Sequence, residues 1–313
     1  MLISLRNFSL ALLVSLLIFG MLSFFVVGLI KDMIDDWVNP TLPTTPTTSS
    51  VTTTGIATDP TGKEVSSMTV LIAGVDSGAS QFDGKLETDA ILLLHIDAAG
   101  EKYMCSFLPP NMLVDMRGYS MPLGLVYSEY GAPALASAVK AYTGVAPSFY
   151  AIVDYTAFAK IIDRLGTVKF NVPFDMYHNP MGEEEPEFDI PAGTQELDGA
   201  GVLGLLRYKG YINGERGRSD MARSLLKEIL SQKLVAIIKD LDEIYAGISA
   251  GIVTNMPGGA VDLATDLINA FTGPFSKDMV VDVEYPTRAS EVPGGPYVTP
   301  MLEQALTRYK PYR

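Results

Sequence analysis

Cysteine and histidine are scarce in this chain. Cys105 is the only cysteine among 313 residues, and His95 and His178 are the only histidines. One cysteine excludes an intrachain disulfide framework and a thiolate zinc site, and two histidines exclude a His-rich metal site. Because Cys105 lies in an apolar stretch, we expect it to be a small core residue.

Positive charge is also in short supply. The chain has 23 Lys and Arg against 36 Asp and Glu, which gives a net charge of −13. An acidic chain repels phosphate backbones, so nucleic acid is not an expected partner, although a local basic cluster still suits small anions. The motif HExxH and the Walker phosphate loop are absent as well. These absences remove the usual signatures of zinc proteases and P-loop enzymes.

One long apolar run is present, at residues 10–30 (LALLVSLLIFGMLSFFVVGLI). It carries no charge and is about 20 residues long, enough to cross roughly 30 Å of hydrocarbon. Arg6 precedes it and acidic residues follow, which favours a cytoplasmic N-terminus of residues 1–9 and an exported remainder. A cleaved signal peptide is the alternative. The run is longer than a usual signal core, and no small-x-small cleavage pattern follows it.

The chain after this run changes character twice. Residues 31–65 are rich in Thr, Pro and Ser and lack the apolar residues that would offset ordering, so we expect an extended extracellular linker. From residue 66 the pattern becomes globular. We expect one main domain at 66–240 and a C-terminal portion at 241–313 that packs on it.

Strand-like and helix-like segments alternate along the domain, which indicates an α/β layer fold. The expected strands are Met68–Val75, Ala90–Asp97, Met104–Leu108, Phe149–Val153 and Thr167–Val172. The expected helices are Ala132–Tyr142, Thr156–Leu165, Leu197–Tyr208 and Ser219–Ile238. Gly144 is expected to end the first helix, Asp154 to cap the second and Gly166 to close it.

Two carboxylates stand at the ends of neighbouring apolar runs. Asp76 ends the run VLIAGV, and Asp89 precedes the run AILLLHI. If the runs pair as antiparallel strands, both carboxylates lie at one edge of the sheet. Their repulsion would be relieved by a divalent cation, and Mg²⁺ prefers oxygen ligands, often only one or two carboxylates together with substrate phosphates. The alternative is that both are simply loop-end residues, which Asp favours.

The segment Gly199–Gly204 matches the pattern GxGxxG, but we reject a dinucleotide site there. It follows Asp198 and runs into an apparent helix, whereas the nucleotide fingerprint follows a strand. A helix face of small residues in close packing is the preferred interpretation.

The densest basic cluster follows this segment. It comprises Arg207, Lys209, Arg216, Arg218 and Arg223. Arg218 directly precedes Ser219, a plausible N-cap for the long helix, and helix N-termini and Arg side chains both suit phosphate oxygens. The alternative is a solvated face balanced by Glu215 and Asp220.

Several stretches occur together in the order and spacing of one family. They are VLIAGVDSG, ETDAILLLHID, FYAIVDYTAFAKIIDRLGTVKFNVPFDM, IPAGTQELDGAGVLGLLRYK, GERGRSD and TNMP. In these stretches the chain resembles the LytR-CpsA-Psr family of bacterial cell-envelope transferases. The likeness covers residues 69–234 and extends more weakly to residue 271.

The resemblance implies a central mixed β-sheet flanked by helices in α/β/α layers, preceded by one transmembrane helix, with an apolar pocket for a polyprenyl chain. It implies a phosphotransferase that moves a glycopolymer, such as teichoic acid or capsule, from a polyprenyl-diphosphate carrier to peptidoglycan. The expected product is a phosphodiester on a muramic acid hydroxyl. The expected location is a bacterial cell membrane, with the domain outside, and the expected cofactor is Mg²⁺.

The resemblance also implies roles for particular residues. Asp76 and Asp89 fall where the family places magnesium-linked carboxylates, although one of them alternatively acts as the base. Arg207 matches the first Arg of an Arg-Tyr-Arg-like element, and Arg218 matches the Arg that opens the long helix. These are the expected catalytic residues. Arg207 and Arg218, with the rest of the basic cluster, are the expected diphosphate-binding residues.

The chain departs from the family at several cationic positions. Glu87 replaces the Arg of a Gly-Arg-Ser/Thr-Asp element, Pro110 the Arg of Pro-Arg-Asp, and Pro122 the Lys of Lys-Ile-Asn. Lys209 and Met221 stand where further Arg residues are common. Lys does not replace Arg in bidentate phosphate binding.

These losses leave three hypotheses. The first is an active, divergent transferase in which Arg117, Arg216 or Arg223 substitutes for the missing cations. The second is a protein of the same fold that holds polyprenyl phosphate or envelope polymer without turnover. The third is a membrane-anchored interaction protein without a ligand, against which the retention of Asp76 and Arg207 argues.

Overall fold

The computed structural model describes residues 57–58, 64–76, 86–179, 188–248, 251–256, 265–271, 275–293 and 295–313. All of them belong to one compact unit, residues 52–313. The predicted membrane helix at 10–30 and most of the predicted linker lie outside the described residues. Within the described residues, no helix is both long enough and apolar enough to cross a bilayer.

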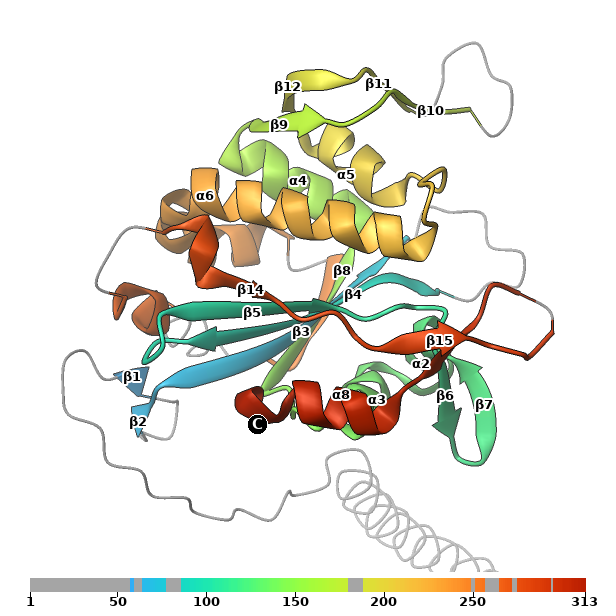
Figure 1. Cartoon of the computed structure of the whole chain (residues 1–313). Coiled ribbons are helices and arrows are strands. Elements are labelled where there is room, and N and C mark those ends of the chain that lie inside the picture. Colours follow the sequence, from blue (N-terminus) through green and yellow to red (C-terminus); the bar gives the residue numbers. More distant parts are fainter. Residues whose placement is uncertain are drawn as a thin grey trace, which may run out of the picture. The chain divides into compact units, whose positions relative to one another are not determined.

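A six-stranded mixed sheet forms the centre of this unit (Figure 1). The strand order is β13–β8–β3–β4–β5–β14. Strands β3 and β8 pair in parallel, as do β5 and β14, and the other neighbours pair antiparallel. The bounds are β3 Ser67–Val75, β4 Thr88–Asp97, β5 Lys102–Phe107, β8 Phe149–Asp154, β13 Ile252–Thr254 and β14 Val280–Asp282. The predicted mixed sheet is therefore confirmed.

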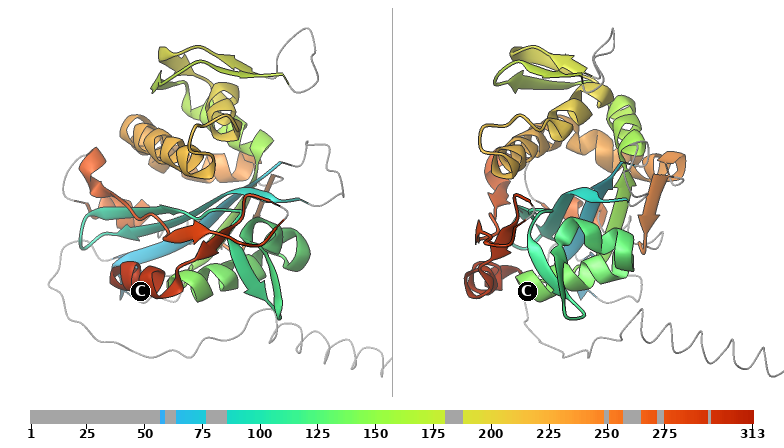
Figure 2. Two further views of the ribbon diagram at one scale, coloured as in Figure 1. Left: turned by 45° about the vertical axis from the view of Figure 1, so that its right-hand side comes forward. Right: turned by 90° about the vertical axis from the view of Figure 1, so that its right-hand side faces the viewer.

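Helices cover both faces of the sheet (Figures 1 and 2). One face carries α3 (Ala132–Thr143) and α8 (Leu302–Arg308), and the other carries α4 (Tyr155–Leu165), α5 (Gly199–Arg207) and α6 (Glu215–Ile248). We call them the α3 face and the α6 face.

The predicted helix caps are present. Gly144 closes α3 in the left-handed conformation at φ 74°. The Asp154 carboxylate caps α4 by accepting a 2.8 Å hydrogen bond from the Thr156 amide. Gly166 is the C-cap of α4, with φ 82°.

Short strands and helices complete the unit. The two-stranded ladders are β1 (Ala57–Thr58) with β2 (Glu64–Val65), β6 (Leu113–Met116) with β7 (Tyr119–Pro122), β9 (Val168–Val172) with β12 (Gly193–Leu197), β10 (Met176–His178) with β11 (Phe188–Ile190), and β15 (Thr287–Ala289) with β16 (Val298–Pro300). Further helices are α2 (Val126–Tyr130), η1 (Leu123–Leu125), η3 (Lys277–Met279) and η4 (Lys310–Tyr312), and residues 265–269 are also helical.

Three predicted boundaries need correction. The end of the predicted linker forms a two-stranded ladder, because β1 and β2 pair there. The predicted break between residues 240 and 241 lies inside α6, and the C-terminal portion supplies both edge strands of the sheet. The long helix begins at Glu215, not after Ser219, because the Arg218 amide already donates an i→i−4 hydrogen bond to the Gly214 carbonyl at 3.1 Å.

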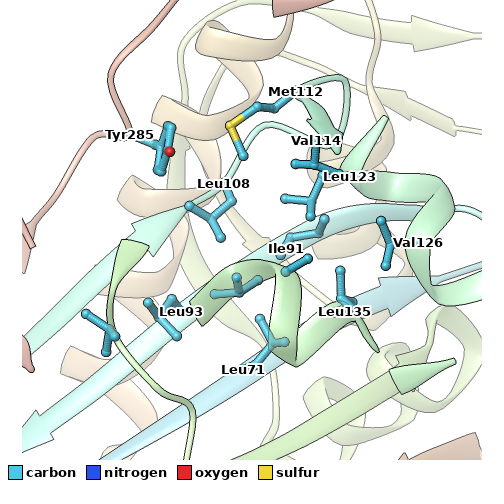
Figure 3. Close-up of a cluster of buried hydrophobic side chains, with 14 of the residues drawn as sticks. Leu71, Ile91, Leu93, Leu108, Met112, Val114, Leu123, Val126, Leu135 and Tyr285 are labelled. Atoms are coloured by element: carbon cyan, nitrogen blue, oxygen red, sulfur yellow. The ribbon is translucent and has the colours of Figure 1, made fainter. Parts of the chain in front are cut away.

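The α3 face holds a continuous buried core (Figure 3). Alternate residues of β3 and β4, including Leu71, Ile91 and Leu93, point into it and are at most 1% exposed. Leu135 of α3 meets them from the helical side. Cys105 is fully buried in a separate cluster on the α6 face, as its apolar surroundings predict. Burial raises the pKa of its thiol to about 12.

Candidate functional site

The end of the β3–β4 pair brings the two strand-end carboxylates to one edge. The strands are antiparallel, and Val75, the last residue of β3, lies opposite Thr88, the first of β4. Asp76 follows Val75, and Asp89 follows Thr88. The pairing that the sequence predicts therefore forms, and both acidic residues belong to the same end of the sheet.

A β-bulge decides which face Asp89 takes. The register of the two strands shifts between Gly74 and Val75. Ile91 points into the core of the α3 face, and the buried Thr88 hydroxyl donates a 3.0 Å hydrogen bond to a carbonyl of η1 on that side. Because strict alternation would put residues 88 and 91 on opposite faces, the bulge turns Asp89 and its neighbour Ala90 together toward the α6 face.

Arg207, the last residue of α5, holds the first carboxylate. Its Nη2 lies 2.9 Å from Oδ2 of Asp76, and the two side chains are 32% and 18% exposed. The ion pair is thus only partly screened by solvent, and each group retains an accessible edge. α5 reaches this point because Gly199 packs against α4: a Cβ there would lie 2.1 Å from the Ala159 carbonyl oxygen. The GxGxxG segment is therefore a close-packed helix face.

Arg218, in the first turn of α6, reaches the second strand. Its Nη2 donates a 2.7 Å hydrogen bond to the main-chain oxygen of Asp89. Its Nε and Nη2 also contact the Glu215 carboxylate at 3.1 and 2.5 Å. The side chain is only 13% exposed. Glu215 therefore fixes the orientation of this guanidinium beside Asp89.

Tyr155 lies among these groups, and the sequence analysis missed it. It is the first residue of α4, and the residue is 7% exposed. The Cζ atom of Arg207 lies 5.9 Å from the centre of its ring. Burial raises the pKa of the phenol, Asp89 and Asp76 raise it further, and Arg218 and Arg207 lower it. All four expected catalytic residues thus act on this one phenol.

A positional signal for Tyr155 was present in the sequence. β8 is parallel to β3, and Asp154 lies opposite Val75. The residue after β8 therefore belongs to the same edge as Asp76. This position becomes visible only once the parallel pairing of β3 with β8, which lie far apart in the sequence, is known.

Arg216 and Arg223 of the basic cluster pair with acidic residues other than Asp76 and Asp89. Arg216 is 68% exposed and lies 3.4 Å from the Glu284 carboxylate, and Arg223 pairs with Asp220. Both arginines line a cavity of about 620 Å³ between the start of α6 and the C-terminal segment. Lys209 is exposed in the segment that follows α5. The structure therefore divides the predicted cluster, with Arg207 and Arg218 at the carboxylates.

The segments that depart from the family gather in space. Thr88 binds the Gly124 carbonyl, and the Gly124 amide donates a 2.8 Å hydrogen bond to the Pro110 carbonyl. These residues represent the Leu-Glu-Thr-Asp, Pro-Pro-Asn and Pro-Leu-Gly elements. The missing cations would thus have stood on one flank, next to Asp89, where Glu87 is exposed.

The three proposed substitutes each have another partner. Arg117 lies 5.0 Å from the centre of the Tyr130 ring, and Arg216 and Arg223 form the ion pairs given above.

The two carboxylates have the donor chemistry that magnesium prefers. Among the described residues no group of three or more His, Cys, Asp or Glu is gathered as a closed metal site. Asp76 and Asp89 offer carboxylate oxygens, both within electrostatic range of the Tyr155 phenol. Mg²⁺ commonly takes one or two carboxylates and completes its shell with water and substrate phosphate, so this pair fits it in kind.

Comparisons with known proteins show the family and the fold of this chain. The sequence model of the LytR_cpsA_psr family matches residues 42–306. The chain is 27% identical to the regulatory protein MsrR of Staphylococcus aureus over 202 residues, 62% of this chain and 58% of the relative. It is 30% identical over 145 residues to the probable cell wall biosynthesis protein LcpB of Corynebacterium glutamicum, 46% of this chain and 34% of the relative.

A third relative has a transferase name. The polyisoprenyl-teichoic acid–peptidoglycan teichoic acid transferase TagV of Bacillus subtilis is 22% identical over 60% of this chain and 49% of its own length. The match to each of these relatives therefore covers less than two thirds of that protein. The crystal structure of B. subtilis TagV has a TM-score of 0.63 at 17% identity, covering 79% of this chain and 95% of that one. A putative transcription regulator from Eubacterium siraeum has a TM-score of 0.66 at 15% identity, with 86% and 98% covered. These likenesses show the fold.

Proposed function

The chain belongs to the LytR-CpsA-Psr family, and from that premise we propose that it transfers a glycopolymer from a polyprenyl-diphosphate carrier to peptidoglycan. The observation that carries the proposal is the convergence at the β3–β4 edge. Arg207 contacts Asp76, and Arg218 binds the main chain of Asp89. Two cations beside two carboxylates suit a diphosphate and the hydroxyl group that attacks it.

The proposed reaction is a displacement at phosphorus. The acceptor hydroxyl oxygen attacks the phosphorus that carries the polymer sugar, and the bond from that phosphorus to the bridging oxygen breaks. Polyprenyl monophosphate leaves with the bond's electron pair, and a phosphodiester joins polymer to acceptor. The hydroxyl proton passes to Asp76 or Asp89 as general base.

The arginines supply electrostatic stabilisation. Negative charge builds up on the phosphate oxygens and the leaving group, and Arg207 and Arg218 would bind those oxygens. Asp76 and Asp89 would hold Mg²⁺, which when bound neutralises phosphate charge. The carboxylate that does not act as the base would orient the arginine guanidinium beside it.

We further propose a single-pass arrangement in a bacterial cell membrane. The apolar run at 10–30 would anchor the chain with its N-terminus in the cytoplasm. The Thr-rich residues that follow would hold the domain outside, where peptidoglycan and lipid-linked polymer meet.

A binding protein without turnover is the second candidate. The observation that favours it is the contact between the Thr88, Pro110 and Gly124 segments, which puts all three cationic losses on one flank of the site. A site with fewer cations can still hold a lipid phosphate through Arg207 and Arg218 while stabilising the transition state too weakly.

One experiment separates these candidates. The full chain in detergent is given a short-chain polyprenyl-diphosphate disaccharide and a soluble peptidoglycan fragment, with and without Mg²⁺, and Asp76→Ala is run beside it. We expect Mg²⁺-dependent phosphodiester formation that Asp76→Ala abolishes. Tight binding without product would establish the binding protein. Absence of both binding and product would reject both functions.

A further inference from the structure

We infer that the Tyr155 hydroxyl is a further substrate-contacting group, a neutral hydrogen-bond donor to the phosphate oxygens held between Arg207 and Arg218. The inference rests on the proposed function, since it assumes that an anionic phosphate group binds at this edge. It adds a contact that neither the basic cluster nor the carboxylate pair provides.

The backbone directs Tyr155 to this edge. β8 runs parallel to β3 and ends at Asp154, opposite Val75, so the next residue belongs beside Asp76. The Asp154 carboxylate caps α4 by binding the Thr156 amide at 2.8 Å, which turns the chain into the helix at Tyr155. A strand end and a helix start thus fix the backbone of this residue.

The ring position depends on Gly74. A Cβ at Gly74 would lie 2.8 Å from Cε1 of Tyr155, closer than real Cβ contacts. The missing side chain lets the ring lie against β3, under the Arg207 guanidinium at 5.9 Å. There the phenol is within electrostatic range of both carboxylates and both guanidiniums.

The Tyr155 hydroxyl, like that of buried Tyr103, lacks the hydrogen bond that three other buried tyrosines make within the described residues. Tyr211 donates to the Leu205 carbonyl at 2.7 Å, Tyr285 donates to the Tyr142 carbonyl at 2.9 Å, and Tyr309 bonds the Ser106 hydroxyl. A buried tyrosine hydroxyl usually has such a partner.

The Tyr155 hydroxyl has no such partner among the residues that the structure describes, although the residue is buried. Its oxygen is not sealed in the interior, because Asn111 Oδ1 is the only fully enclosed side-chain oxygen or nitrogen without a partner in the described part of the chain. The hydroxyl is therefore available to a ligand at the edge.

The chemistry suits a phosphate. Non-bridging phosphate oxygens accept hydrogen bonds, and a phenol is a neutral donor at physiological pH. A bond from such a donor to a charged acceptor is stronger than one between neutral groups. In a site whose other flank lacks the family's cations, this donor adds phosphate affinity without adding charge.

The test compares Tyr155→Phe with Tyr309→Phe in the full chain. Farnesyl diphosphate and uncharged farnesol are the probes, and affinities are measured by titration calorimetry. We expect Tyr155→Phe to bind the diphosphate about tenfold or more weakly, with farnesol affinity and the thermal unfolding midpoint unchanged. Tyr309→Phe removes a hydroxyl that bonds Ser106 in the α3-face core, so it should lower the midpoint without changing the preference for diphosphate over farnesol.

A second variant guards against a purely structural effect. p-Aminophenylalanine at position 155 restores an N–H donor and should recover the diphosphate affinity. Equal diphosphate affinity in wild type and Tyr155→Phe would overturn the inference, as would an equal loss of farnesol affinity. Neither outcome touches the proposed transfer. Wild-type protein that binds no diphosphate would overturn both proposals.

Discussion

The two faces of the central sheet are built from the same strands but are closed to different degrees. On the α3 face, Leu71 and Leu93 are fully buried in the largest core cluster. Their sequence neighbours Ile72 and Leu94 point to the α6 face and are only partly buried. The α6 face is therefore less completely covered at Ile72 and Leu94, although Val70 and Leu92 on the same face are buried.

This difference separates stability from function along a single strand. Residues of the α3 face are expected to contribute mainly to the free energy of folding. Residues of the α6 face lie on the side of the sheet where Asp76 and Arg207 pair, and we expect them to contribute mainly to ligand binding. Partly covered apolar side chains on the α6 face suit a ligand with an apolar chain and an anionic head group. The proposed carrier lipid is such a ligand.

The largest effect is expected at the polar edge of the α6 face. Asp76→Asn should reduce transfer at least about 100-fold, because it removes a charge from the pair of carboxylates while retaining shape. Asp97→Asn is the matched control at the other end of β4, where the side chain accepts a 3.0 Å hydrogen bond from the Gly100 amide. Product formation by chromatography is the readout. Similar losses in both variants would contradict a specific role for Asp76.

Adjacent leucines test the two faces directly. Leu93→Ala should lower the free energy of unfolding by about 3 kcal/mol, since it opens a cavity in the sealed core. Leu94→Ala should cost only about 1 kcal/mol and instead weaken binding of a long-chain polyprenyl phosphate. Denaturant titration and lipid-binding assays measure the two quantities. If Leu94→Ala proves as destabilising as Leu93→Ala and leaves lipid affinity intact, the α6 face is an ordinary core.

Two arginines of one helix turn test the divided basic cluster. Arg218→Gln should weaken diphosphate binding by about 2 kcal/mol, or roughly 30-fold, because its guanidinium is nearly buried beside Asp89. Arg216→Gln should change it by less than about twofold, because that side chain is 68% exposed and faces Glu284. Calorimetry with farnesyl diphosphate gives both values. The reverse ranking would indicate that the anion binds at the cavity lined by Arg216 and not beside Arg218.

The smallest effect concerns Cys105 on the α6 face. Its thiol is fully buried, and burial raises its pKa to about 12, so the reactive thiolate is almost absent at pH 8. We expect labelling by a maleimide to be slow and to become slower still with bound polyprenyl phosphate, which would stabilise the closed face. Mass spectrometry follows the label. Rapid labelling of folded protein at pH 8 would show that the α6 face opens freely.

Local signals in the sequence accounted for much of the framework. Apolar runs marked the strands, and Gly144, Asp154 and Gly166 marked the helix ends, because caps and left-handed turns depend on a few adjacent residues. The meeting of Asp76 and Asp89 followed from hairpin-like pairing of neighbouring runs. Their metal and catalytic roles remain predictions.

Long-range contacts decided the rest. The edge strands β13 and β14 are only three residues each, too short to have a pattern of their own, and form because the sheet offers them a partner. The start of α6 moved from Ser219 to Glu215, where the helix gains an acidic residue in its first turn and positions Arg218. The basic cluster, which is dense in the sequence, is distributed over the end of α5, the segment after it and the start of α6.

The sequence by itself determined the acidic composition, the apolar run at 10–30, the α/β class and the two carboxylates at strand ends, because each depends on residue type and short-range periodicity. Only the tertiary structure turned Asp89 to the α6 face, brought Arg207 to Asp76 and put Tyr155 within electrostatic range of both pairs. The physical reason is that three separate features place these residues. The bulge in β4 orients Asp89, the parallel strand β8 positions Tyr155, and the packing of α5 on α4 positions Arg207. No single segment of the chain contains all three features.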